Sequence, residues 1–331
     1  MFLLISSKLI KKLAVSQLIE LIDNETKKES DIIMKVKESK PSAIEEEKVS
    51  YASINYTNLT LSDISKTFKL HGVDSFIIAI ISIKEEWQIE KVFKLDKDVL
   101  LDLSDKPLKD LVNTEDFIII GCKEIIGLES KGVLLFNGTI YDANNSKILK
   151  EKSYPIVNSV ESLYKLLIDT STYYKEETAK KCTQILRDKI LMNIEGDFAF
   201  IYMDLANKFM LFGKDRLGKK SLLLHDQAEE LCITSISFEK GNYKEIIGNT
   251  LIYLDFNTCY VEKNPYNVSA SRFFSNDFIT SNKELLKGLE DVLTKATAKR
   301  VKEEVAVLFS GGIDSLLLAY LVHKVVPSGK E

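Results

Sequence analysis

The chain has 331 residues, of which 45% are hydrophobic and 28% are charged. These values are typical of a globular protein, and they exclude a wholly disordered, collagen-like or coiled-coil chain. The 45 basic residues are outnumbered by 49 acidic residues, so the net charge of -4 provides no broad basic field for nucleic acid. No apolar run reaches the roughly 20 residues that a membrane helix needs. We therefore expect neither nucleic acid nor a membrane as a partner.

Residues 1–48 are predicted to form an N-terminal extension. The apolar opening, residues 1–5, is cut short by two serines and a lysine, and residues 8–22 then carry apolar side chains at helical spacing. This amphipathic helix is a candidate contact for a protein partner. Residues 24–48 are dense in Lys, Glu and Ser, which indicates a solvated linker. The start of the segment is poor in acids, as in a mitochondrial presequence, but the segment contains no arginine.

The chain contains four cysteines, and they stand singly, without the spacing of a zinc site or a disulfide framework. Free cysteines of this kind are usually small, buried apolar residues, so we expect none of them to be a nucleophile. The pattern fits a reducing compartment, and a cytoplasmic location is expected.

Residues 49–275 change to short β-prone runs separated by polar turns, with few helices. Helical spacing recurs at 159–169 and 177–191. Strands grouped with few, segregated helices predict an α+β layered fold with mostly antiparallel sheets. The predicted strands lie at 75–83, 117–122, 132–142, 197–205, 208–215, 221–225, 231–236 and 250–256.

A second domain is predicted from residue 281 to residue 331. Residues 281–302 form an amphipathic helical pattern, and the apolar run VAVLF at 305–309 has the length of a strand. The hexapeptide SGGIDS follows at 310–315, and residues 316–326 are apolar nearly all round. Strand, glycine loop and helix in this order predict the start of a parallel α/β sheet that is covered on both faces.

The SGGIDS hexapeptide carries the clearest chemical signal of the sequence. Gly311 and Gly312 have no Cβ, so a ligand can approach their backbone N–H groups closely. Ser310 and Ser315 add hydroxyl donors, and the following helix directs the positive end of its dipole at the loop. Asp314 would repel a bare phosphate, but it suits a phosphate that is accompanied by Mg2+. The loop lacks the lysine of a Walker A motif, which excludes the usual kinase and NTPase chemistry.

With this loop in view, the sequence resembles the asparagine synthetase family, whose loop belongs to the ATP pyrophosphatase superfamily. LLFNGTIYD (134–142), EGDFAFIYMD (195–204) and GKDRLGKKSLLL (213–224) are similar to three elements of that family's glutamine amidotransferase domain, in the same order. The resemblance implies a class II amidotransferase-like domain at 49–275, with an Ntn-hydrolase-like αββα sandwich. It also implies the first strand, loop and helix of a Rossmann-like ATP pyrophosphatase domain at 281–331.

The family forms β-aspartyl-AMP from ATP, Mg2+ and aspartate, and nitrogen from glutamine or ammonia then displaces AMP. By resemblance, Asp314 would meet Mg2+ through pyrophosphate, and Leu308 would lie beside the adenine. Asn137 and Gly138 match the family's glutamine-binding Asn-Gly, and Glu161 stands near an aspartate that holds the glutamine amine. The residues that would bind ATP and pyrophosphate are Leu308, Ser310, Gly311, Gly312, Asp314 and Ser315.

The amidotransferase half departs from the family at its nucleophile. The family uses an N-terminal cysteine whose own amino group is the base, but here Phe2 follows Met1. The nearest likeness to the family's start is at 48–57, with Tyr51 or Ser53 in place of cysteine. No arginine precedes Arg187, so the usual clamp on the glutamine carboxylate has no candidate.

We therefore assign no catalytic residue to the amidotransferase half and expect its glutaminase to be inactive. The retained Asn137, Asp215 and Arg216 can be explained as residues that maintain turns and an ion pair of the fold.

The synthetase half departs from the family in length. One strand and one helix do not make an ATP-binding sheet, so we expect a continuation, a protein partner or the amidotransferase-like domain to cover helix 316–326. This chain alone is expected to be inactive as a ligase. The alternative is a non-catalytic scaffold or nucleotide-binding interaction protein. A weaker alternative is a different enzyme with the same loop, such as a tRNA-modifying enzyme.

Overall fold

The computed structural model describes residues 2–6, 59–70, 75–83, 86–95, 107, 110, 117–141, 159–171, 186, 194–225, 231–237, 243–248, 250–257, 261–265, 282–301 and 305–326. The chain divides into two compact units, Met1–Ile140 with Ser146–Tyr266, and Tyr141–Asn145 with Asn267–Glu331. Among the described helices, none combines the length and the hydropathy that a membrane span requires.

The first unit contains two antiparallel sheets. In order across the sheet, the seven-stranded sheet consists of β11 (Tyr243–Glu245), β9 (Leu223–His225), β10 (Cys232–Thr234), β1 (Phe2–Ser6), β4 (Phe117–Cys122), β2 (Phe76–Ser82) and β3 (Gln88–Leu95). The six-stranded sheet consists of β13 (Val261–Pro265), β12 (Thr250–Asp255), β8 (Phe209–Lys214), β7 (Gly196–Asp204), β6 (Gly132–Ile140) and β5 (Ile125–Ile126).

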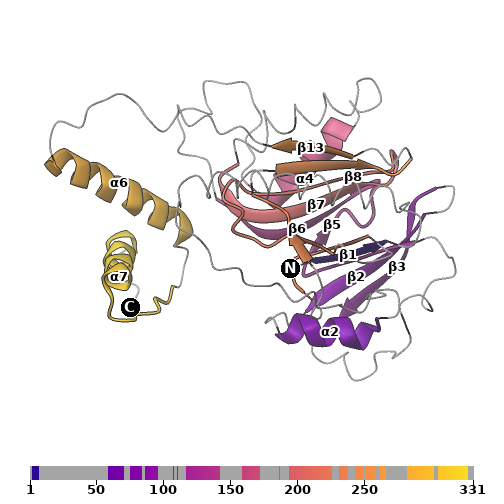
Figure 1. Cartoon of the computed structure of the whole chain (residues 1–331), viewed down its shortest axis with the longest axis horizontal. Helices are drawn as coiled ribbons and strands as arrows, with labels where there is room; N and C mark the ends of the chain where they lie inside the picture. The colour runs from indigo at the N-terminus through magenta and orange to yellow at the C-terminus, as the bar shows by residue number, and fades with distance from the viewer. Residues whose placement is uncertain are drawn as a thin grey trace, which may run out of the picture. The chain divides into compact units, whose positions relative to one another are not determined.

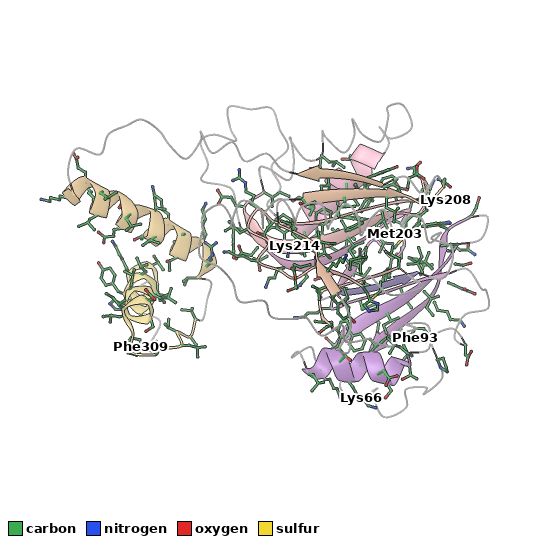
Figure 2. All side chains as sticks on the ribbon, in the orientation of Figure 1. Lys66, Phe93, Met203, Lys208, Lys214 and Phe309 are labelled. Atoms are coloured by element: carbon green, nitrogen blue, oxygen red, sulfur yellow. The ribbon has the colours of Figure 1, made fainter. Side chains whose placement is uncertain are left out.

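Strand β7 shows how the layers are built. Because successive side chains of a strand point to opposite faces, Ile201 and Met203 enter the core between the two sheets, while Phe200 and Tyr202 enter a second core on the outer face. Figure 2 shows side chains filling the space between the sheets, where Met203 lies. Both faces of β7 are thus covered, which explains its nearly continuous hydrophobic sequence.

One helix covers the outer face of each sheet (Figure 1). Helix α2 (Leu61–Leu70) packs on the seven-stranded sheet, where the rings of Phe68 and Phe76 stack at a centroid distance of 4.6 Å. Helix α4 (Val160–Ser171) packs on the six-stranded sheet through Leu163 and Leu167, which lie in the outer core with Phe200. The order helix, sheet, sheet, helix confirms the predicted α+β, Ntn-hydrolase-like αββα sandwich.

The N-terminal boundary differs from the prediction. Residues 1–48 were expected to lie outside the sandwich, but Phe2–Ser6 forms β1, in the middle of the seven-stranded sheet between β10 and β4. The run is long enough for a strand, and its partners lie more than 110 residues away in sequence, at Cys122 and Thr234. The spacing of residues within the segment contains no information on such distant pairing. The predicted N-terminal extension is therefore wrong for Phe2–Ser6.

The second unit consists of two described helices, α6 (Asn282–Arg300) and α7 (Ile313–Val325). The Glu290 carboxylate joins them, since it accepts hydrogen bonds from Lys324 at 2.6 Å and from Tyr320 at 3.4 Å. The predicted strand 305–309 is wrong, because these residues form neither a helix nor a strand and pair with no strand in the described part of the chain. A lone apolar segment has no backbone groups beside it with which to form a sheet.

Several predictions fall on residues outside the described ranges. These are the helix at 8–22, the linker at 24–48, the family-like start at 48–57 and nearly all of the helix at 177–191. In the last segment Leu186 is described, and it is buried in the outer core of the six-stranded sheet.

A capping box begins α2 and has a pH-dependent component. The Thr60 hydroxyl oxygen accepts the Asp63 N–H at 3.1 Å, and the Asp63 carboxylate accepts the Thr60 N–H at 3.0 Å and the Thr60 hydroxyl at 2.8 Å. The backbone hydrogen bond from Thr60 is the main reason why the pKa of Asp63 lies below its ordinary value. A carboxyl whose pKa is lowered by folding stabilises the fold above its unfolded pKa and loses this effect as the pH falls.

We predict that Thr60→Ala lowers the free energy of unfolding by about 1 kcal/mol at about pH 7, because the first turn of α2 loses its cap. The difference from the parent protein should shrink as the pH falls through the lowered pKa of folded Asp63, because the Thr60 hydroxyl then loses a charged acceptor. Urea unfolding at neutral and at low pH measures both effects, and Ser62→Ala is the control within the same turn. An equal difference at low and neutral pH would show that the Thr60 hydroxyl is not coupled to the Asp63 charge, since the backbone N–H of Thr60 remains in the variant.

Candidate functional site

A cavity of about 350 Å³ opens where the end of β4 meets the end of β6. Phe2, at the start of β1, pairs with Cys122, the last residue of β4. Lys123 and Glu124 follow Cys122 and line the cavity. The Cys122 thiol donates to the carbonyl of Phe136 on β6 at 3.6 Å, so this contact joins the two sheets beside the cavity.

Two of the three residues predicted to bind glutamine line this cavity, Asn137 and Gly138. Gly138 has a φ of 140°, and a Cβ there would lie 2.0 Å from the carbonyl oxygen of Asp197 on β7. Glycine is therefore required at this position by the close pairing of β6 with β7. Asn137 and Thr139 lie two residues apart on β6 and share a wall of the cavity.

Glu161, the third predicted residue, is not among the lining residues. It lies in the first turn of α4, directly after Val160, which does line the cavity. Its pKa lies below the ordinary value, first because of its own backbone N–H and then because of the Ser159 hydroxyl. Glu161 is thus an exposed residue of the helix N-terminus that neighbours a lining residue in sequence and does not itself line the cavity.

The cavity also contains residues that the sequence analysis did not identify. Lys123 follows the predicted strand FIIIGC, and Lys220 lies in the GKDRLGKKSLLL run, which was interpreted only as a family likeness. Glu124 and Thr139 complete the polar part of the lining. Of these residues, Lys123 and Glu124 directly follow the end of β4, and such a position is the one signal that could have indicated a site, because polar side chains of different segments meet at strand ends.

No nucleophile is found among the described residues at this cavity. Cys122 is fully buried, and burial raises the pKa of its thiol, which disfavours the reactive thiolate. Neither Cys122 nor Cys232 forms a disulfide, and both are buried, as predicted for structural cysteines. Cys182 and Cys259 lie outside the described residues. The part of the chain that the structure describes also contains no group of acids, histidines and cysteines that could hold a metal.

Asp215 organises the loop that carries Lys220. Its buried carboxylate accepts the backbone N–H groups of Phe198 at 3.0 Å, Leu217 at 2.8 Å and Lys219 at 3.2 Å. This role in a turn was predicted for Asp215 from the sequence. The predicted ion pair of Arg216 is not among the ion pairs of the described residues, and its side chain is exposed.

A second cavity, of about 660 Å³, lies at the opposite end of β6. Three turns form it, and its lining includes Trp87, Ser130, Lys131 and Lys208. None of the residues predicted from the sequence to bind a ligand lies in it.

The glycine loop of the second unit opens α7, as predicted. Gly311 has a φ of 80°, and a Cβ there would have no atom within 4 Å, so open space surrounds the loop. Gly312 is the N-cap residue of α7, and no side chain caps this helix. The hydroxyls of Ser310 and Ser315 lie 3.2 Å apart, and Ser315 donates to the Gly312 carbonyl at 2.9 Å.

The rest of the predicted ATP-binding set is also at this loop. Asp314 lies in the first turn of α7, and Leu308 is 94% exposed just before the loop. The unfilled space, the uncapped helix start and the two hydroxyls fit an anion accompanied by a hard cation.

Comparison with known proteins adds one sequence relative. No protein-family profile matches the chain. Over 219 residues the chain is 25% identical to an asparagine synthetase domain-containing protein of Saccharomyces cerevisiae, which covers 62% of this chain. The chain spans 38% of that relative's length. This match confirms the predicted resemblance to asparagine synthetase-like proteins.

Solved structures give weaker likenesses. A glutamine phosphoribosylpyrophosphate amidotransferase from B. subtilis is 11% identical, with 81% of this chain and 63% of that chain covered and a TM-score of 0.36. A glutamine aminotransferase class-II domain protein from Silicibacter pomeroyi is 8% identical, with 58% and 91% covered and a TM-score of 0.35. At such scores, the fold description rests on this chain's own strand order and layers.

We predict that Asp215→Ala lowers the free energy of unfolding by about 3 kcal/mol, because buried backbone N–H groups lose a charged acceptor. Arg216→Ala, at the exposed neighbouring position, should stay within about 0.5 kcal/mol of the parent. Urea unfolding followed by circular dichroism measures both. Equal stability of the two variants would show that the Asp215 turn is not a constraint on the fold.

Proposed function

We propose that the chain provides the amidotransferase-like half and the pyrophosphate loop of an ATP-dependent amide ligase of the asparagine synthetase type. The proposed reaction activates aspartate as β-aspartyl-AMP, and ammonia then displaces AMP to give asparagine. The observation that carries the proposal is the open, uncapped glycine loop at the start of α7, with Gly311 in the left-handed region. The motif likeness and the yeast relative support it. We place this activity in the cytoplasm, in keeping with the single, widely spaced cysteines of the sequence.

The residues of the loop have distinct proposed roles. The backbone N–H groups at Gly311 and Gly312 and the hydroxyls of Ser310 and Ser315 would bind pyrophosphate oxygens. Asp314 would hold Mg2+, which neutralises the charge of the phosphates. In the free loop the serine hydroxyls bond within the loop, so a ligand must replace these hydrogen bonds. Leu308 offers an exposed apolar side chain that a nucleotide base can cover.

The amidotransferase-like half is proposed not to hydrolyse glutamine. Phe2 begins the strand that runs past the cavity, and Cys122 beside it is buried with a raised pKa. An acyl-enzyme requires an accessible nucleophile, and the described lining residues of the cavity include no thiol for that role. Ammonia is therefore the proposed nitrogen donor.

We predict that the purified chain releases no glutamate from glutamine above the rate of a heat-denatured sample. Glutamate formation, measured with a coupled dehydrogenase, is the readout. The control is Cys122→Ser, which should leave this background rate unchanged. Glutamate release that disappears in this variant would overturn the assignment of Cys122 as a structural residue.

We predict that the chain binds ATP in the presence of Mg2+ and that Gly311→Ala weakens this binding about tenfold. The reason is the positive φ at Gly311, where a side chain costs about 1–3 kcal/mol. Gly288→Ala is the matched control, since Gly288 lies inside α6 with nothing within 4 Å of a Cβ. That change should leave ATP affinity unchanged. Isothermal titration calorimetry gives the affinities, and equal affinities in all three proteins would contradict the loop assignment.

Pyrophosphate release separates the ligase from a non-catalytic relative. The assay contains ATP, Mg2+, aspartate and ammonia, and it is run on the chain and on a longer protein that includes it. Release that depends on aspartate and is lost in Asp314→Ala supports the ligase. ATP binding without release in either protein supports the alternative, a nucleotide-binding scaffold. The exposed apolar side chains of α6 and α7 favour that alternative, because they offer a surface to a protein partner.

A further inference from the structure

We infer that the second cavity, of about 660 Å³ at the opposite end of β6 from Asn137, binds a small zwitterion with an aromatic body. The aromatic ring would contact Trp87, and the carboxylate and ammonium groups of the ligand would meet the charged residues of the lining. The inference does not depend on the proposed ligase or on the glycine loop. It rests on three features of the cavity, which are its fixed turns, its buried indole and the two signs of charge around it.

Hydrogen bonds within and between the turns hold the walls of the cavity. In the turn before β6, the Ser130 hydroxyl lies within hydrogen-bond distance of the carbonyls of Gly127, at 3.0 Å, and Gly132, at 2.8 Å. The Leu205 N–H, in the turn between β7 and β8, donates to the carbonyl of Lys131 at 2.7 Å, so this bond joins the two turns. A ligand that enters a cavity with fixed walls loses less free energy to ordering.

Lys208 lines the same cavity in an unusual backbone conformation. Its φ is 59°, in the left-handed region that residues other than glycine, asparagine and aspartate rarely adopt. The Asp204 carboxylate stabilises this turn, since it accepts the Asn207 N–H at 2.7 Å and the Asn207 side-chain amide at 2.9 Å. The Lys208 carbonyl accepts the Phe256 N–H at 3.0 Å. These contacts fix the backbone of Lys208 at one end of the six-stranded sheet (Figure 2).

Trp87 provides the ring of the proposed contact. Its side chain is 8% exposed, and its ring meets the ring of Phe256 edge-on at a centroid distance of 4.8 Å, which fixes its position. Among the described residues, the indole N–H of Trp87 has no acceptor, although a buried indole nitrogen usually has one. A ligand oxygen can therefore accept a hydrogen bond that the described part of the protein does not form. Ile89, Leu128 and Leu205 extend the apolar part of the lining.

Charged side chains of both signs surround this apolar part. Glu86 and Glu129 line the cavity together with Lys131 and Lys208. Within the described residues, Glu86, Glu129 and Lys131 form no ion pair. The buried Asp204 does not line the cavity, and the flanking positions 84–85 and 90–91 each add one acid and one base. This arrangement favours a molecule with one charge of each sign, because a polyanion would also meet two carboxylates.

The lining is suited to binding a ligand without changing it. Among the described lining residues, none is a histidine or a cysteine, and the Ser130 hydroxyl is occupied by backbone carbonyls. A volume of about 660 Å³ lies within the range of small-molecule pockets. An aromatic amino acid combines a ring, an acceptor oxygen for Trp87 and one charge of each sign. Because such a ligand binds the folded state, it stabilises that state.

The test uses L-phenylalanine as the probe, with the whole chain and without ATP. We expect binding in the millimolar range or tighter by isothermal titration calorimetry, together with a higher unfolding temperature. The analogue 3-phenylpropanoate lacks the ammonium group, and 2-phenylethylamine lacks the carboxylate, so each should bind about tenfold more weakly. L-Alanine lacks the ring and should also bind about tenfold more weakly, since it cannot cover the apolar lining.

Variants of the lining locate the binding at this cavity. Trp87→Phe keeps a ring but removes the indole N–H, and Lys131→Met and Glu129→Gln each remove one charge. Each variant should weaken L-phenylalanine binding about tenfold. Lys287→Met is the matched control, because Lys287 is exposed on α6 in the second unit, and it should leave the affinity unchanged. Circular dichroism checks the fold of each variant, and the two exposed charged positions decide the test if Trp87→Phe unfolds.

Three results would overturn the inference. The first is the absence of both heat and thermal shift at about 10 mM L-phenylalanine. The second is equal binding of L-phenylalanine and the two analogues that lack one charge, since the charged residues would then have no role. The third is a loss of affinity in Lys287→Met as large as that in Lys131→Met. None of these results bears on ATP binding, which is proposed for the glycine loop of the other unit.

Discussion

The pairing of β1 with β4 and β10 is the constraint on which the first unit depends. In the order of the seven-stranded sheet, β1 alone connects β11, β9 and β10 to β4, β2 and β3. Without it the sheet would separate into two halves with exposed edges, and the core between the sheets would lose one wall. The same pairing places Phe2 opposite Cys122 and so fixes where β4 ends and where Lys123 enters the cavity. The N-terminal residues therefore serve both the fold and the site.

The opposite wall of the cavity has a similar double role. Gly138 allows β6 to approach the carbonyl of Asp197 closely, and Asp215 binds the Phe198 N–H on the same neighbouring strand. These contacts hold the strand that carries Asn137 and the loop that carries Lys220. The motifs that resemble the amidotransferase domain therefore have two roles in this chain, because they contain residues that maintain a turn and residues that line a cavity.

The sequence predicted the layers well because strand runs and helical stripes are local patterns. The alternation in β7 and the glycine loop before α7 follow directly from neighbouring residues. The errors were long-range: β1 pairs with distant strands, and 305–309 needs a neighbouring strand that the described residues do not supply. The lysines of the cavity were missed for the same reason. Lys123 and Lys220 have no shared motif, and only the folded sheets bring them to one space.

The cavity lined by Lys123 and Lys220 and the glycine loop before α7 differ in how completely one unit of the chain encloses them. Every residue that lines the lysine cavity belongs to the first unit, whose sandwich has a covered core on both sides of the six-stranded sheet. The glycine loop instead precedes a helix on which Leu316, Leu317 and Leu318 are about half exposed and Leu321 alone is buried. Apolar surface of this extent is stable only when another surface covers it. The cavity is thus lined by the first unit alone, whereas α7 presents an apolar surface that a further segment or a protein partner can cover.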